Sequence, residues 1–227
     1  IYTLFISLII GGSLLFFNRK NLKKITIYEK IFTVLLGYFL FPLIISIPYY
    51  LGIQNVTILN SYFEAISGFT STGFTIFDNI KQLDESLILW RSTSQWIGGI
   101  YFLFSILLLI DIFDKNLKQS FTEYLSFNYN EIFKQSFKII VIYSSLTFLI
   151  FILFKTVNLR TFDAFNLSLS IISSGGFLPV NNIDYLFESD LSKIFLSFSM
   201  VLSFFSLFLV YNLVFFNRKK LSFLSED

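Results

Sequence analysis

Two short segments rich in hydroxyl residues and glycine are the positions in this sequence best suited to chemistry. The first is Thr70, Ser71, Thr72, Gly73 and Phe74, and the second is Ser173, Ser174, Gly175, Gly176 and Phe177. Neither contains an acid, a base or a thiol, so what they offer is backbone oxygen. Glycine adopts positive φ without strain and can turn successive carbonyls to one side. Because a row of such carbonyls replaces the hydration shell of a cation, these segments predict cation coordination.

The composition excludes most catalytic chemistry. The chain has 227 residues, of which 55% are hydrophobic and only 14% charged, and it contains no Cys and no His. Thiol nucleophiles, histidine bases and thiolate or imidazole metal sites are therefore absent. An intramembrane aspartyl protease is also disfavoured, because Asp111 is predicted at the inner membrane face and the other acids mostly at the outer face. We expect no enzyme, no cofactor and no nucleic-acid partner, but we expect a lipid bilayer around the chain.

Five uncharged runs are long enough, or nearly so, to cross a membrane: residues 1–18, 31–63, 92–110, 139–154 and 194–217. A spanning helix needs roughly 20 mainly apolar residues. A sixth charge-free run, 164–183, contains Gly175, Gly176 and Pro179, which are poor residues for a lipid-facing helix. We interpret it as a re-entrant segment. The predicted fold is an all-α membrane protein with five transmembrane helices and two re-entrant pore-helix and loop segments.

The basic residues predict the orientation of these spans. Lysines and arginines gather at 19–30, 115–138 and 218–220, whereas the connections at 52–88 and 156–192 are mainly acidic. By the positive-inside rule the three basic segments are cytoplasmic. Both glycine-containing segments then face the outside.

An internal repeat relates the two segments. With a shift of 103 residues, eight of the 16 positions from Ser71 to Ser86 are identical to their counterparts from Ser174 to Ser189, far more than unrelated segments share. The predicted organisation is a leading helix and basic loop at 1–27, a helix–pore–helix repeat at 28–113, a cytoplasmic loop at 114–130, a second repeat at 131–217 and a tail at 218–227.

Each re-entrant segment is expected to open with a short helix. Ser61 and Glu64 have the spacing of a capping box, and that helix is expected to end near Phe69. In the second repeat, Thr161 is the expected N-cap, with Asp163 in the first turn. Small residues in membranes often mark close helix packing instead. Their occurrence twice, each time after a short capped helix on the acidic side, favours an ion path.

Several of these residues resemble a known family. The run FEAISGFTSTGFT at 63–75 and LILWRSTSQWIGGI at 87–100 resemble the first repeat of TrkH/KtrB-type potassium transporters, relatives of the plant HKT carriers. The later GGF at 175–177 is similar to their second filter. The resemblance implies four helix–pore–helix repeats around one potassium pathway. Residues 70–73 and 173–176 would each supply one quarter of its carbonyl filter, and Gly73 would favour potassium over sodium.

The resemblance also implies partners and a location. Such transporters work in the bacterial inner membrane, usually as homodimers with a cytosolic nucleotide-binding regulatory subunit. We expect this chain to be a fragment or half of a four-repeat pore, since it holds two repeats. The alternative is a non-conducting membrane scaffold or degenerate half-transporter.

Three further residues are expected to support the filter. Arg91 falls near the outer end of a predicted span, and we expect it to pair with Glu64 and hold the pore helix to that span. Gln95 belongs to the same motif. The neighbouring Gly98 and Gly99 predict a close approach between helices.

Overall fold

The computed structural model describes residues 11–13, 26–113 and 129–215, and these residues contain helices and loops but no strand. The elements are α2 (Ile27–Gly52), α3 (Ile58–Phe69), the 3₁₀ turn η1 (Ile80–Gln82), α4 (Glu85–Phe113), α6 (Tyr129–Thr156), α7 (Thr161–Ile172), the 3₁₀ turn η2 (Ile183–Tyr185) and α8 (Asp190–Phe215). The predicted all-α class is confirmed. Most of the predicted first span, the loop at 114–128, the tail and the Asp111 side chain lie outside this description.

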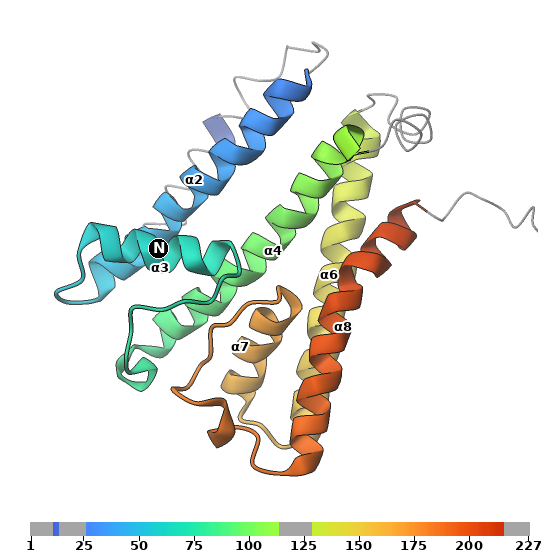
Figure 1. Ribbon diagram of the computed structural model, residues 1–227. Helices are drawn as coiled ribbons and strands as arrows, with labels where there is room; N and C mark the ends of the chain where they lie inside the picture. The colour runs from blue at the N-terminus through green and yellow to red at the C-terminus, as the bar shows by residue number, and fades with distance from the viewer. Residues whose placement is uncertain (1–10, 14–25, 114–128, 216–227) are drawn as a thin grey trace, which may run out of the picture.

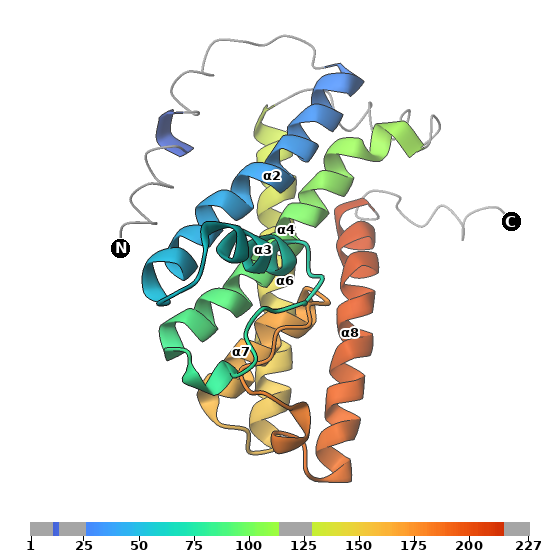
Figure 2. The ribbon, with the colours of Figure 1, turned by 60° about the vertical axis from the view of Figure 1, so that its left-hand side comes forward.

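Four long helices make up most of the molecule (Figure 1, Figure 2). α2, α4, α6 and α8 have 26 to 29 residues. At 1.5 Å per residue each is about 39–44 Å long, more than the hydrocarbon core of a bilayer, which is about 30 Å thick. Within the described residues, Ile27–Gly52 and Ser136–Thr156 also have the apolar composition of a membrane span.

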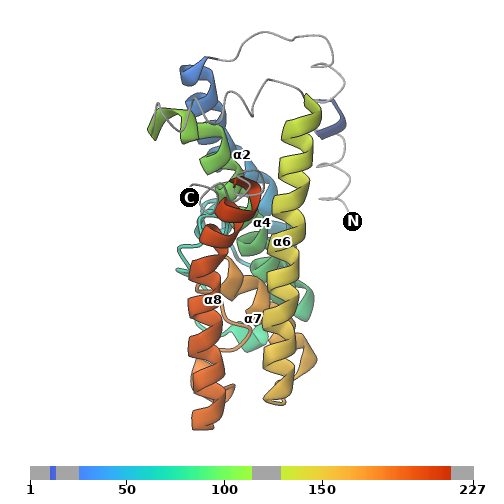
Figure 3. The same ribbon diagram turned by 90° about the vertical axis from the view of Figure 1, so that its right-hand side faces the viewer.

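Two short helices lie among the long ones. α3 packs on α2 and α4, while α7 packs on α4, α6 and α8 (Figure 1). Each has 12 residues and is about 18 Å long, too short to cross the core. α6 and α8 lie side by side along most of their length (Figure 3).

The second half of the chain repeats the backbone path of the first. α7 begins and ends 103 residues after α3, and η2 follows η1 at the same interval. Left-handed residues recur at this offset too. Asn55 and Asn158 have φ of 63° and 61°, and Ser71 and Ser174 have φ of 55° and 54°.

The starts of both short helices differ from the predictions. α3 begins one turn earlier than expected, with Thr57 as N-cap: its side chain accepts a hydrogen bond from the Asn60 N–H. The predicted capping box of Ser61 and Glu64 is therefore wrong, because the Ser61 hydroxyl donates to the Thr57 carbonyl inside the helix. The predicted N-cap Thr161 is also wrong, since it is already the first helical residue.

Two groups of buried side chains hold the helices together. Tyr49, Phe69 and Leu87 join α2, α3 and α4. A larger cluster around Tyr143 and Phe154 joins α6 and α7 to α4. These clusters place the C-terminal ends of α3 and α7 on either side of α4, so the loops that follow can meet.

Candidate cation-coordination site

The first loop (residues 70–74) and the second loop (residues 173–177) leave their helices in the same way. In the first, the N–H groups of Ser71 and Thr72 donate to the carbonyls of Gly68 and Ser67 at 3.0 Å. In the second, Ser174 and Gly175 donate at 2.8 Å to carbonyls three and five residues earlier. The left-handed serines Ser71 and Ser174 make this reversal, as residues after a helix C-terminus often do. The backbone N–H groups thus turn back toward the helix ends.

The carbonyl oxygens of the two loops have no such partners. Among the hydrogen bonds of the described residues, none ends on the backbone carbonyls of Thr70, Ser71, Thr72, Gly73, Ser173, Ser174, Gly175 or Gly176. All eight residues are exposed or half-buried, so their carbonyls are open to a ligand. Eight unpaired carbonyls on two adjacent loops therefore leave an oxygen-rich surface that a cation can satisfy.

The two loops meet at glycines. Gly73 has φ of +81°, and a methyl group built on it would lie 2.6 Å from the Cα of Gly176. That separation is shorter than any real contact between carbon atoms, so both the conformation and the close approach require glycine at position 73. Gly176 does not have positive φ, so the expectation that its backbone needs glycine for that conformation is not met. Its close approach to Gly73 is the reason that remains.

The two phenylalanines that end the loops have different surroundings. Phe74 is 69% exposed, and its carbonyl accepts a hydrogen bond from the Ser67 hydroxyl at 2.6 Å. Phe177 is buried, and the guanidinium of Arg91 lies 4.2 Å from the centre of its ring. Only the second phenylalanine therefore contributes to the core behind the loops.

Gln95 on α4 supports the second loop. It is fully buried, and its amide oxygen, oriented to satisfy its neighbours, accepts the N–H groups of Gly176 and Phe177 at 3.1 and 3.2 Å. Its amide nitrogen donates to the Ser170 hydroxyl at 2.7 Å. A side chain on Gly175 would collide with this amide. Gln95 therefore reaches from the first half of the chain to hold the second loop.

Arg91 and Glu64 form a buried ion pair behind the first loop. The Arg91 Nε lies 2.8 Å from a Glu64 carboxylate oxygen, and the two side chains are 1% and 0% exposed. The carboxylate also accepts the Thr75 hydroxyl at 3.0 Å and the Ile76 N–H at 3.0 Å. Buried charges are tolerated when paired and hydrogen-bonded in this way. The pair ties α3, α4 and the chain after the first loop together.

Arg91 also reaches the chain after the second loop. One guanidinium nitrogen donates to the Thr75 hydroxyl at 3.0 Å, and another donates to the Leu178 carbonyl at 3.4 Å. Sequence reasoning missed Thr75, Leu178 and Ser170 as partners. No signal in the sequence identifies them, since two of the three contacts join residues 75 or more positions apart.

A second connection lies farther along the loops. The Asn181 side chain accepts the Ile80 N–H at 2.7 Å and donates to the Asn79 side chain at 2.9 Å. Within the described residues no three acidic side chains gather to form a metal site.

The fold is that of a helical membrane protein in which two short helices each lead into a carbonyl-bearing loop. The family model TrkH, described as a cation transport protein, matches residues 1–226. The chain belongs to the TrkH family. This bears out the resemblance carried by its sequence motifs.

Individual relatives agree with this assignment. An uncharacterized cation transporter of Methanocaldococcus jannaschii is 30% identical over 180 residues, which cover 77% of this chain and 36% of the relative. The Trk system potassium uptake protein TrkH of Escherichia coli K12 is 30% identical over 99 residues, covering 43% of this chain and 20% of that protein.

One solved structure has the same fold. The crystal structure of the potassium transporter TrkH from Vibrio parahaemolyticus matches with a TM-score of 0.70 at 23% identity, covering 88% of this chain and 40% of that one. The chain thus spans about a third to two fifths of the length of these two longer relatives, from Methanocaldococcus jannaschii and Vibrio parahaemolyticus.

Proposed function

We propose that the two loops line a potassium pathway, each supplying one quarter of a filter of backbone carbonyls. The observation that carries this proposal is a set of eight carbonyls, on two loops in contact, that accept no hydrogen bond from the described residues. Carbonyl oxygens replace the water around a cation as it enters. The C-terminal ends of α3 and α7 add partial negative charge beside the loops.

Potassium is the proposed ion for two reasons. Several relatives of this chain are named potassium uptake proteins, including TrkI of Halomonas elongata, which is 44% identical over 55 residues. In addition, Gly73 occupies the first-loop position where glycine goes with potassium in similar carriers. No covalent step is required, so the proposed function is transport and not enzymatic catalysis.

The proposed membrane arrangement has five spans and two re-entrant segments. The recurrence of α3, η1 and their left-handed residues 103 positions later supports two helix–pore–helix repeats, at 28–113 and 131–217. The basic loops would face the cytoplasm of a bacterial cell and the filter the outside. The chain would contribute half of a four-repeat pore. A homodimer and a cytosolic nucleotide-binding regulatory subunit are the proposed partners.

The test is potassium-driven flux into liposomes that contain the protein, with sodium as competitor and a Gly73→Ala variant. A methyl group there meets the Gly176 backbone at 2.6 Å, so the loops must separate and flux should fall at least about tenfold. Gly52→Ala is the matched control, because its methyl group would make ordinary 3.5 Å contacts with Leu87.

The outcomes separate the alternatives. Selective flux that is lost in Gly73→Ala and kept in Gly52→Ala supports the filter. Equal flux in both variants contradicts it. Absence of flux from the chain alone, with flux restored by the remaining repeats of a longer protein, identifies the chain as part of a pore, whereas no flux in either case favours a scaffold.

A further inference from the structure

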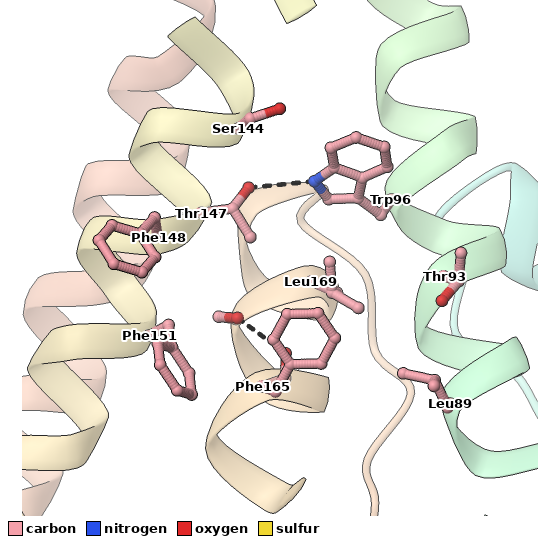
Figure 4. A pocket seen from close by; sticks show the side chains of 10 residues that line it. Leu89, Thr93, Trp96, Ser144, Thr147, Phe148, Phe151, Phe165 and Leu169 are labelled. Carbon is pink, nitrogen blue, oxygen red and sulfur yellow. Dashed lines mark hydrogen bonds between the residues drawn. The ribbon is translucent and has the colours of Figure 1, made fainter. Parts of the chain in front are cut away.

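An apolar groove lies between α4, α6 and α7, apart from the candidate cation site. Its volume is about 470 Å³, within the range of about 300–1,000 Å³ typical of small-molecule sites. Trp96 and Leu89 line one side, Phe148 and Phe151 the opposite side, and Phe165 and Leu169 the floor (Figure 4). The groove is thus built from all three helices.

The indole N–H and two of the four hydroxyl groups that line the groove are already bonded. The Trp96 Nε1 donates to the Thr147 hydroxyl at 3.0 Å, and that hydroxyl donates to the Tyr143 carbonyl at 2.8 Å. The Ser168 hydroxyl donates to the Phe165 carbonyl at 2.7 Å. The accessible lining is almost entirely carbon. Such a lining offers water few partners, and this favours an apolar occupant.

The groove opens sideways onto a surface that faces lipid in a membrane protein. Phe148 at its edge is 62% exposed, and Leu149 and Ile152 continue the exposed apolar surface along α6. Phe165, 44% exposed, meets Phe151 edge to face at 6.0 Å between ring centres. From Ser144 to Phe151 the groove follows α6 for about 10 Å, at 1.5 Å per residue.

A lysine lies at the end of this groove nearest the start of α7. Ser144, Phe148, Phe151 and Lys155 follow one another at helical spacing on one face of α6. The Lys155 ammonium donates to the Leu159 carbonyl at 3.0 Å and the Thr161 hydroxyl at 3.1 Å. Both partners are neutral, and in the described part of the chain no carboxylate lies within ion-pair distance of Lys155.

The neighbouring Arg160, unlike Lys155, has acidic partners. Arg160 pairs with Glu85 at 3.1 Å and with Asp163 at 3.2 Å, so its charge is already balanced. Among the described residues Lys155 therefore has no acidic partner, and it lies on α6 one turn beyond Phe151 of the groove. That combination matches the two parts of a phospholipid, an anionic phosphate and an acyl chain.

We propose that this groove binds one phospholipid of the outer leaflet, with an acyl chain between α4, α6 and α7 and its phosphate against Lys155. The acyl chain supplies dispersion contacts that the groove atoms lack when it is empty. The charge on Lys155 distinguishes a bound lipid from bulk lipid. This site is separate from the potassium pathway, although the choice of the outer leaflet rests on the membrane orientation proposed above.

The test uses quenching of Trp96 fluorescence by a phosphatidylglycerol with brominated acyl chains. The full chain carries Trp90→Phe, so that Trp96 is the one tryptophan left of the two in the sequence. Ser144→Phe fills the groove, and Ser145→Phe is the matched control because Ser145 is exposed on the adjacent face of α6. Saturable quenching that is lost in Ser144→Phe and kept in Ser145→Phe is expected.

The headgroup contact is tested separately, so that the proposal does not depend on one bulky variant. Lys155→Gln should raise the half-saturating lipid fraction about fivefold, equivalent to about 1 kcal/mol per basic residue at a membrane surface. Lys138→Gln, at the other end of the groove on the same helix, should leave the half-saturating lipid fraction unchanged. Quenching that rises linearly with lipid fraction in every variant means bulk contact only and overturns the proposal. Absence of quenching means that protein covers the groove and overturns it too.

Discussion

Glu64→Leu should destabilise the protein strongly, because it leaves a charge buried without its counter-charge. Arg91 is 1% exposed and would lose its 2.8 Å contact with the carboxylate. Breaking a buried ion pair by removing one partner costs about 3–5 kcal/mol. The Thr75 hydroxyl, the Leu178 carbonyl and the Phe177 ring remain near the guanidinium. These contacts place the expected loss of unfolding free energy near the lower limit, about 3 kcal/mol.

The second half of the chain suggests how to restore this stability. The positions 103 residues after Glu64, Thr75 and Arg91 are apolar: Leu167, Leu178 and Ile194. The triple variant Glu64→Leu, Thr75→Leu and Arg91→Ile copies this apolar set into the first half. Replacing a whole buried polar group by packed apolar residues is often neutral or stabilising. The Ile76 N–H would still lose its acceptor, at a cost of about 1–3 kcal/mol.

Thermal unfolding of the detergent-solubilised protein measures these effects. At about 2–4 °C per kcal/mol for a chain of this size, Glu64→Leu should lower the midpoint by about 6–12 °C, and the triple variant should recover part of that loss. Glu85→Gln is the control: its pair with Arg160 is exposed, so its loss should be about 1 kcal/mol or less. A wild-type midpoint for Glu64→Leu, or a triple variant no more stable than Glu64→Leu, would refute the reasoning.

Two further predictions use the same unfolding assay. Thr57→Ala should lower the free energy of unfolding by about 1 kcal/mol, because it removes the N-cap of α3. Ser61→Ala should lower it by less. A larger loss for Ser61→Ala would show that Ser61 is the N-cap after all. Gly98→Ala should destabilise by about 1–3 kcal/mol, because its methyl group would overlap the Phe69 carbonyl, while Gly52→Ala should have little effect. Equal stability of the two glycine variants would mean that α4 does not need this close approach.

The helical architecture could be predicted from local patterns. Long uncharged runs indicated the long helices, and the end of α3 at Phe69 was expected within the first repeat. The helix starts were less predictable. Thr57 and Ser61 are both hydroxyl residues with cap-like spacing, and only the packing of α3 on α2 and α4 decides which of them lies outside the helix.

The site was predictable in part. The loop residues and the pairing of Glu64 with Arg91 followed from residue types, since a buried charge requires a partner. The partners of Gln95 and the reach of Arg91 to Leu178 did not follow, because they join the two halves of the chain. The apolar groove could not be predicted from the sequence either, since its lining comes from three separate helices.

The sequence by itself determined that this chain is helical, that it belongs in a membrane, and where its carbonyl-bearing loops fall. Hydrophobicity, charge and glycine act locally, so their spacing is sufficient for these conclusions. Only the tertiary structure decided that Gly73 meets Gly176, that Gln95 holds the opposite loop and that α4, α6 and α7 enclose an apolar groove. Most of these contacts depend on how the helices pack, and packing is a property of surfaces brought together from distant parts of the chain.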